Sequence, residues 1–409
     1  MEGDFIKINE WLTPLSWCYG LGVSIRNLLF DMGLRKSRSF KTPVITVGNI
    51  TVGGTGKTPH VEYLVRLLQD ELHVAVLSRG YKRRSKGFLV ADEHTTTYDV
   101  GDEPFQMKKK FPGVTVAVDR QRVHGILQLT NGDNRKSDVD VVVLDDAFQH
   151  RQVKPGINIL LVDYHRLITY DRLLPAGRLR EPLAAKNRAD IVIVTKCPKD
   201  LKPMEYRVVT KALNLFPYQQ LYFSTLEYDG LKGLYPEAKA APAITMSQHT
   251  QQSTPASSSL ASTNVLLLAG IASPRQMIED LTPLAKSLTP LTFSDHHDFS
   301  ARDVRRINTA FEALPKPRLI ITTEKDGARL TCIEGLSDEV RRHLYVLPIH
   351  IRFLLDQQKD FDNGILEYIQ KSSRPHLLSI LKEKKRKLSD KNTPSAADKT
   401  ITPPPTIKF

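Results

Sequence analysis

The chain has 409 residues, of which 25% are charged and 41% hydrophobic, a composition typical of globular proteins and a length sufficient for two domains. Its three cysteines, Cys18, Cys197 and Cys332, lack metal-ligand spacing and are too few for a disulfide framework, which excludes a disulfide-rich secreted domain. The 58 lysines and arginines exceed the 45 acidic residues and give a net charge of +13, which favours acidic partners such as phosphates, nucleic acid or anionic lipid.

Residues 1–40 are predicted to form a helical segment that lies at a membrane surface. Both tryptophans of the chain, Trp11 and Trp17, fall in an uncharged stretch, 11–25, which basic residues follow from Arg26 onward. Aromatic and apolar side chains beside a basic edge are typical of a helix in the membrane interface. The stretch is too short and too broken by proline and glycine to span a bilayer, and its acidic start is unlike a signal peptide. The alternative is a helix packed on the protein's own core.

A glycine-rich loop between a strand and a helix comes next. The apolar run 44–47 predicts the strand, and apolar residues at helical spacing over 61–68 predict the helix. This order is that of a phosphate-binding loop (P-loop), in which Lys57 reaches the β and γ phosphates and the Thr58 hydroxyl holds Mg²⁺. The residues predicted to bind the nucleotide are Thr51, Val52, Gly53, Gly54, Thr55, Gly56, Lys57 and Thr58.

Two further loops carry side chains suited to a phosphate site. The apolar run 72–77 predicts a strand that leads into the basic loop 78–84, which contains Arg79 and lies either at the ligand edge of the sheet or in a solvated turn. Asp102 and Glu103 precede a predicted helix. They either charge its N-terminus or, if they face the phosphates, one of them binds or orients a substrate hydroxyl or accepts its proton.

A second acidic motif supports the P-loop interpretation. The apolar run 139–144 ends in Asp145 and Asp146, and P-loop enzymes hold Mg²⁺ with an acidic residue at the end of such a strand. Thr51 occupies the position where the strict P-loop pattern has a glycine, so the loop alone also fits an ordinary glycine-rich turn. The acidic pair together with Lys57 and Thr58 makes the nucleotide site the stronger prediction.

The alternation of strands and helices predicts an α/β fold with a mostly parallel sheet covered by helices. Further strands are predicted at 157–162, 190–195, 265–270, 291–293 and 318–323. The predicted parts are the N-terminal segment 1–40, a P-loop domain at 41–200, a smaller α/β lobe at 201–350 with a mobile insert at 238–263, and a C-terminal helix with a disordered basic tail at 351–409.

A cluster of histidines and carboxylates lies in the predicted second lobe, at Asp295, His296, His297 and Asp298. Neighbouring side chains on a strand face opposite ways, which argues against one metal ion bound by both histidines. The remaining alternatives are a structural loop and proton chemistry, in which a histidine beside a carboxylate tunes a catalytic base.

Taken together, these stretches resemble the tetraacyldisaccharide 4′-kinase family of lipid A synthesis. The resemblance runs from about residue 11 to residue 349 and includes the P-loop, whose Thr51 matches the family's variant. The other matching motifs are Ser-Arg-Gly-Tyr at 78–81, Gly-Asp-Glu-Pro at 101–104, Asp-Asp-Ala-Phe-Gln-His at 145–150, the run 174–182, Asp-His-His at 295–297 and Thr-Glu-Lys-Asp at 323–326. The resemblance implies a two-lobed kinase that uses ATP and Mg²⁺ to phosphorylate the 4′ hydroxyl of a tetraacyldisaccharide 1-phosphate, giving lipid IVA.

The resemblance also implies roles for individual residues. Asp102 corresponds to the catalytic base, and His296 corresponds to its partner from the second lobe. The residues implied to bind the phosphates and Mg²⁺ are Lys57, Thr58, Asp145, Asp146 and Gln149, with support from Glu103, Glu181 and Arg79.

The implied partners are the lipid A disaccharide precursor and the anionic inner-membrane surface, with no nucleic acid and no protein partner. The implied location is peripheral, on the cytoplasmic face of that membrane. Two other classes remain open from the residues alone: a GTPase-like or ATPase switch, suggested by 195–196 and 323–326, and a membrane-binding protein that uses nucleotide only for stability. The choice of ATP rests on the resemblance.

Overall fold

The glycine-rich loop follows a strand of the larger sheet, which in the described part of the chain has nine strands in the order β14-β8-β7-β6-β1-β5-β2-β4-β3. The computed structural model describes residues 8–131, 139–235, 237, 260–271, 274–295, 297–331 and 333–372. All the strands between the two edges of this sheet run parallel to one another. The two edge strands, β14 and β3, are antiparallel to their neighbours β8 and β4. The strands are β1 (Val44–Gly48), β2 (Val74–Ser78), β3 (Leu89–Val90), β4 (Thr115–Val118), β5 (Val141–Asp145), β6 (Ile157–Asp163), β7 (Ile191–Thr195), β8 (Gln220–Tyr228) and β14 (Ile349–Phe353).

Helices cover both faces of this sheet, as its doubly buried central strands require. One face packs against apolar residues of α2, α4 and α11, and the other packs against those of α5 and α6. The predicted mostly parallel α/β sheet is therefore confirmed. The helices of this body are α2 (Lys57–Leu68), α3 (Thr97–Val100), α4 (Asp102–Lys110), α5 (Arg122–Asn131), α6 (Pro203–Leu213) and α11 (Gln358–Ser372), with 3₁₀ turns η2 (Ile168–Tyr170) and η3 (Leu183–Arg188).

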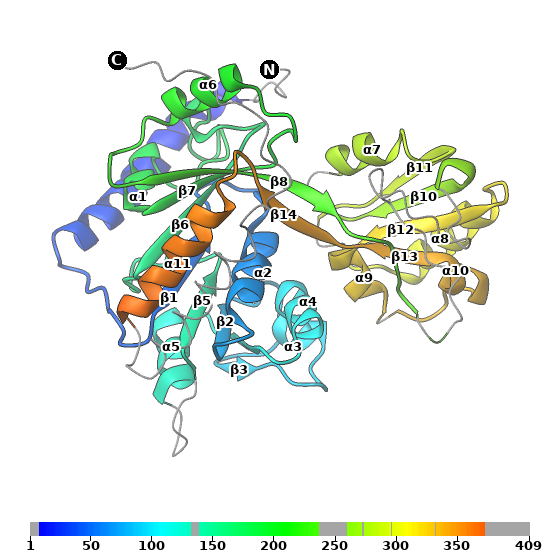
Figure 1. Cartoon of the computed structure of the whole chain (residues 1–409), viewed down its shortest axis with the longest axis horizontal. Helices are drawn as coiled ribbons and strands as arrows, with labels where there is room; N and C mark the ends of the chain where they lie inside the picture. The colour runs from blue at the N-terminus through cyan, green and yellow to red at the C-terminus, as the bar shows by residue number, and fades with distance from the viewer. Residues whose placement is uncertain are drawn as a thin grey trace, which may run out of the picture.

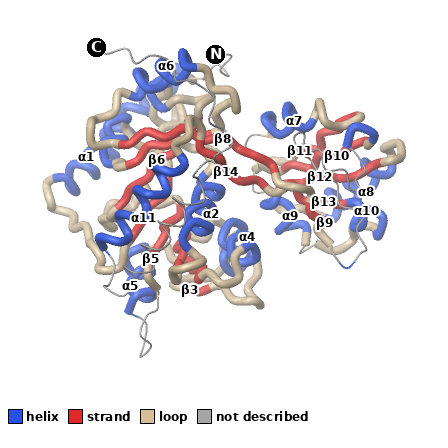
Figure 2. Tube along the Cα trace, viewed as in Figure 1, coloured by secondary structure: helices blue, strands red, loops and turns tan. Residues whose placement is uncertain are grey.

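A second, five-stranded sheet in the order β11-β10-β12-β13-β9 forms a separate lobe, visible in Figures 1 and 2. Its strands are β9 (Lys232–Gly233), β10 (Asn264–Ala269), β11 (Ser287–Thr292), β12 (Arg318–Thr323) and β13 (Leu344–Leu347). Its helices are η5 (Leu260–Ser262), α7 (Arg275–Leu281), α8 (Ala301–Glu312), α9 (Glu324–Leu330) and α10 (Asp338–His343). Apolar clusters on both faces of the sheet give this lobe its own core.

Two adjacent antiparallel strands, β8 and β14, connect the bodies, and Figure 1 shows them running from the large sheet toward the second lobe. Both pair within the large sheet, and α11 packs on that sheet too. Parts of the predicted regions 201–350 and 351–409 therefore pair or pack with the large sheet, and the predicted division of the chain at 200 and 350 stays a prediction. Most of the predicted insert, 238–259, and the predicted tail from 373 lie outside the described residues.

The N-terminal helix α1 (Thr13–Asp31) follows the 3₁₀ turn η1 (Glu10–Leu12) and is held by its small residues. Ser16 Oγ donates to the Leu173 carbonyl oxygen at 3.0 Å, and Ser16 and Gly20 are buried. Trp11 and Trp17 remain 94% and 72% exposed. In the described parts of the chain, none of the helices combines the length and the apolar character that a bilayer span requires.

Candidate functional site

The glycine-rich loop turns between the end of β1 and Lys57, the first residue of α2, as the sequence predicted. Gly53 and Gly56 have φ angles of 120° and 80°, a region that residues with a Cβ disfavour. Gly56 is the N-cap of α2, so the unpaired N–H groups and the positive dipole end of this helix open at the loop. Such a terminus stabilises a phosphate. Thr58 follows in the first turn of the helix.

Asn49, whose role is not apparent from the sequence patterns, holds the loop in place through its side chain and its backbone carbonyl. Its buried Nδ2 donates to Thr55 Oγ1 at 2.8 Å, and its carbonyl oxygen accepts from Gln149 Nε2 at 2.5 Å. Thr195 Oγ1 also donates to the Thr55 carbonyl oxygen at 3.0 Å. These hydrogen bonds hold the loop in one conformation. The Gln149 side-chain amide nitrogen takes part by donating to the backbone of Asn49. A metal-ligand role for Gln149 stays a prediction.

The run 174–182 lies along the glycine-rich loop. The backbone N–H of Val52 donates to the Arg178 carbonyl oxygen at 2.8 Å, and that of Arg180 donates to the Ile50 carbonyl oxygen at 2.7 Å. The Arg180 side chain then lies 3.4 Å from Asp146 Oδ2. The neighbouring Glu181 is buried and pairs with Arg188 at 2.5 Å, which ties its carboxylate to the scaffold.

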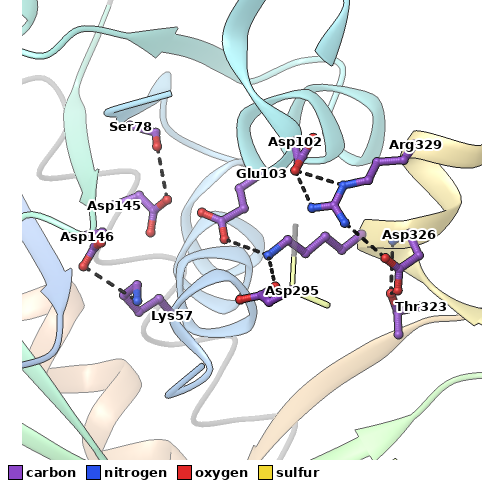
Figure 3. A network of polar contacts seen from close by, with 11 residues as sticks. Lys57, Ser78, Asp102, Glu103, Asp145, Asp146, Asp295, Thr323, Asp326 and Arg329 are labelled. Carbon is purple, nitrogen blue, oxygen red and sulfur yellow. Dashed lines mark hydrogen bonds and ion pairs between the residues drawn. The ribbon is translucent and has the colours of Figure 1, made fainter. Parts of the chain in front are cut away.

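The acidic pair and the loop meet at one edge of the sheet. β5 pairs in parallel with β1 and places Asp145 opposite Val47. Lys57 Nζ lies 3.7 Å from Asp146 Oδ1, and Ser78 Oγ donates to Asp145 Oδ2 at 3.3 Å (Figure 3). The predicted approach of Lys57 to the acidic pair is therefore present in the structure.

The two carboxyl groups differ in their electrostatic environment. Burial raises the pKa of Asp145 to about 7, and the negative charges of Glu103 and Asp146 act in the same direction. Burial would also raise the pKa of Asp146, but the opposing charges of Lys57 and Arg180 hold that pKa below its usual value. An added cation would offset the excess negative charge around Asp145.

The donor set at this turn fits Mg²⁺. Asp145 Oδ1 and Asp146 Oδ1 are buried and have no hydrogen-bond partner among the described residues. Mg²⁺ usually takes one or two protein carboxylates and completes its shell with phosphates and water.

The predicted basic loop lies beside the same turn. Arg79 is exposed just after β2. Burial, with the positive charges of Arg122 and Arg79, lowers the pKa of His150 to about 4, so this histidine is neutral at pH 7. Arg122, which is fully buried, donates to the Asp145 carbonyl oxygen at 3.2 Å and was not identified from the sequence. An arginine after a short strand is so common in sequences that this pattern alone does not predict a functional role for Arg122.

Asp102 and Glu103 are the first two residues of α4 and lie between the P-loop and the second lobe (Figure 3). Asp102 Oδ2 accepts from Nε and Nη2 of Arg329 at 3.0 and 2.5 Å. Lys325 Nζ lies 3.7 Å from Glu103 and 3.2 Å from Asp295. The residues 323–326 were noted as a motif, but their contact with α4 could not be predicted because more than two hundred residues separate the partners.

The histidine cluster divides into two parts. His296, the predicted partner of Asp102, lies outside the described residues. His297 Nε2 lies 3.0 Å from Asp303 Oδ2, and its ring stacks on Phe293 with centroids 4.9 Å apart. Asp303 also accepts from the backbone and side chain of Ser300 at the start of α8, so His297 belongs to the structure of this loop.

A buried histidine links the P-loop to the connecting strand β8. His60 Nδ1 lies 2.7 Å from the Gly56 carbonyl oxygen, and Nε2 lies 3.0 Å from Ser224 Oγ. Because a carbonyl only accepts, Nδ1 carries the proton and the Ser224 hydroxyl donates to Nε2. Burial lowers the pKa of His60 to about 4.

We predict that His60 makes the fold sensitive to acid. In the unfolded chain its pKa is about 6.5, so the unfolded state binds more protons between pH 6.5 and 4, and stability falls as the pH decreases through this window. The loss from this residue reaches about 3 kcal/mol at most. Denaturant unfolding of the parent and of His60→Gln at pH 7.5 and pH 5 measures it. The parent should lose more stability than the variant; an equal loss in both would contradict this prediction.

Comparisons with known proteins agree on one family. The model of the family described as tetraacyldisaccharide-1-P 4′-kinase matches residues 8–370. A tetraacyldisaccharide 4′-kinase of Phocaeicola vulgatus is 55% identical over 91% of this chain and 99% of its own, and one of Bacteroides thetaiotaomicron is 51% identical over 91% and 97%. A crystal structure of LpxK from Aquifex aeolicus in complex with ATP matches with a TM-score of 0.64 and 28% identity, over 88% of this chain and 98% of the other.

Proposed function

The chain belongs to the tetraacyldisaccharide-1-P 4′-kinase family of lipid A synthesis, and we propose that it performs the transfer at the site formed by the P-loop, the acidic pair and α4. The observation that carries this proposal is the approach of Lys57 to Asp146 at 3.7 Å, with Asp102 and Glu103 opposite. As a member of this family, the protein is a kinase that phosphorylates the 4′ hydroxyl of the disaccharide.

ATP is the proposed phosphate donor, in keeping with the ATP complex of the Aquifex aeolicus relative. Lys57 and the N–H groups at the start of α2 would bind the β and γ phosphates, where charge builds up during the transfer. Thr58, Asp145 and Asp146 would hold Mg²⁺, which when bound neutralises phosphate charge and orients the γ-phosphoryl group. The charges of Lys57 and Arg180 hold the pKa of Asp146 below its usual value, which favours the ionised form of this carboxyl.

Asp102 is the proposed residue that receives the sugar hydroxyl. An isolated aspartate, with a pKa of about 3.9, is a weak base, so Asp102 would act chiefly by orienting the 4′ oxygen and accepting its proton late in the transfer. His296 remains the proposed proton acceptor behind it. Glu103 and Lys325 close the site from α4 and the second lobe, and excluding water there would suppress ATP hydrolysis.

Helix α1 is proposed to bring the site to the lipid. Its buried side, which includes Ser16 and Gly20, faces the protein, and several of its exposed residues are large and apolar. These residues are Leu15, Trp17, Leu21, Ile25 and Leu28 of α1, and Trp11 in the preceding turn η1 is exposed as well. Apolar and aromatic surface on a docked helix, in a chain with a charge of +13, suits the surface of an anionic bilayer. We propose a peripheral position on the cytoplasmic face of the inner membrane, the side on which ATP is available.

Trp11→Ala and Trp17→Ala should each weaken binding to liposomes. Removing a side chain that enters the apolar interface costs about 1.5–3 kcal/mol, or roughly 10- to 100-fold in partitioning. Co-sedimentation with vesicles containing anionic lipid measures the effect. Val90→Ser, which changes an exposed apolar residue on β3, is the matched control and should bind as the parent does. Unchanged binding of both tryptophan variants would show that α1 does not insert.

The transfer assay separates this proposal from the other classes. Protein, Mg²⁺, ATP labelled at the γ-phosphate and tetraacyldisaccharide 1-phosphate are combined, and label is followed into lipid and into free phosphate. Label in the lipid supports the proposed donor and site. Label released only as free phosphate would support a switch, and no label movement would support a binding protein. In the structure, Lys196 pairs with Asp163 at 2.7 Å and Asp326 is buried in the second lobe, so neither is presented as a guanine-reading group.

A further inference from the structure

Helix α9 of the second lobe lies antiparallel to α4, and an ion pair joins the two helices at each end. Asp102 at the start of α4 pairs with Arg329 near the end of α9, whereas Lys110 at the end of α4 pairs with Glu324 at the start of α9. Lys110 Nζ lies 2.6 Å from Glu324 and also 2.6 Å from Glu62 of α2. The two lobes are therefore joined by ion pairs that form together only in this alignment of α4 and α9.

Arg329 is itself held in place on the side of the second lobe. Its side chain is only 7% exposed, and Nη1 lies 3.2 Å from Oδ1 of Asp326, which is completely buried. Oδ2 of Asp326 accepts from the Gly270 backbone N–H at 2.8 Å and from Thr323 Oγ1 at 2.7 Å. The guanidinium thus has a fixed plane, and its Nε and Nη2 both point at Oδ2 of Asp102 (Figure 3).

We infer that Arg329 is a positioning residue for the phosphoryl transfer and acts through Asp102. The inference rests on the proposed role of Asp102 as the group that receives the sugar hydroxyl. Two N–H donors in a rigid fork restrict the carboxylate to one rotamer, which a single ammonium group cannot do. The restraint comes from the second lobe, so Asp102 is held for reaction only when the two lobes lie in this arrangement.

This arrangement couples the position of the lobes to the chemistry. When α9 moves away from α4, Asp102 loses the two Arg329 donors, while the P-loop contacts of Lys57 and Asn49 are unaffected because they lie within the large sheet's body. A misplacement of about 1 Å in a reacting group can cost about 100-fold in rate. Nucleotide binding and phosphate transfer should therefore respond differently to loss of Arg329.

The test is a double-mutant cycle of Arg329→Ala and Asp102→Ala, measured by transfer of labelled phosphate to the lipid. In the parent, Arg329→Ala is expected to lower kcat about 10- to 100-fold and to change KM for ATP less than about threefold. In the Asp102→Ala background, the same substitution should lower kcat less than about twofold, because its only route to the reaction is already removed. Arg305→Ala, on the exposed side of α8 in the same lobe, is the matched control and should keep the parent's kcat.

A second variant distinguishes a catalytic defect from a folding defect, because Arg329→Ala also removes the ion pair of Arg329 with the buried Asp326 and could destabilise the fold. Arg329→Lys keeps the charge, and it should melt within a few degrees of the parent and recover part, not all, of kcat. An unchanged or increased kcat in Arg329→Ala would overturn the inference. So would an equal fold-loss with and without Asp102. A full kcat in Asp102→Ala alone would instead overturn the proposed role of Asp102, so the two failures are distinguishable.

Discussion

Replacing Lys57 by methionine is expected to lower kcat by about 10³-fold or more while leaving the fold intact. The transition state of phosphoryl transfer spreads negative charge over the γ-phosphoryl oxygens, and Lys57 is the cation at the start of α2 beside the acidic pair. Methionine retains most of the side chain's length and apolar contacts but removes the charge. Steady-state transfer to the lipid, together with a thermal melt, measures the two effects separately.

The matched control for this substitution is Lys359→Met, at an exposed position on α11. It removes the same charge from the protein without touching the site, so kcat should equal that of the parent. A loss of less than tenfold in Lys57→Met would show that the loop does not hold the transferred phosphate. The interpretation of residues 51–58 as the nucleotide site would then be wrong.

Asp102→Asn is expected to lower kcat by about 10²- to 10⁴-fold, the range typical of a lost general base, with little change in KM for ATP. The amide has the same shape and can still accept a hydrogen bond from Arg329, but it cannot take the proton of the sugar hydroxyl. The expected defect is therefore chemical. It should appear in single-turnover transfer, where product release does not limit the rate.

Glu205→Gln provides the control for Asp102→Asn, because it makes the same change at the first turn of another helix, α6, outside the site. It should leave kcat unchanged. Equal losses of kcat and of ATP affinity in Asp102→Asn would assign Asp102 to the nucleotide site and remove it from the step that activates the sugar hydroxyl.

Local sequence patterns predicted the nucleotide side of the site well. Gly56, Lys57 and the pair Asp145-Asp146 each follow an apolar strand, and the carboxyl ends of parallel strands meet at one edge of a sheet. The position of Lys57 next to the acidic pair follows from these rules alone, without knowledge of any other part of the chain.

The contribution of the second lobe could not be predicted in the same way. Arg329 and Lys325 reach α4 because α9 packs against it, and no local pattern specifies which helices pack across two lobes. The strand β8 illustrates the same limit, since it lies in the predicted second lobe, 201–350, but pairs in the large sheet. Glu181 shows a different limit: the family resemblance implies a supporting role for it at the phosphates and Mg²⁺, but only the structure shows that Arg188 pairs with its carboxylate.

The most direct test of the proposed nucleotide site is a crystal structure with Mg²⁺ and a non-hydrolysable ATP analogue. We expect Lys57 within hydrogen-bond distance of the terminal phosphate, and a metal bound by Thr58 at about 2.1 Å and by Asp145 or Asp146 directly or through water. A triphosphate bound elsewhere, with Lys57 still paired to Asp146 and no metal at residues 145 and 146, would contradict it.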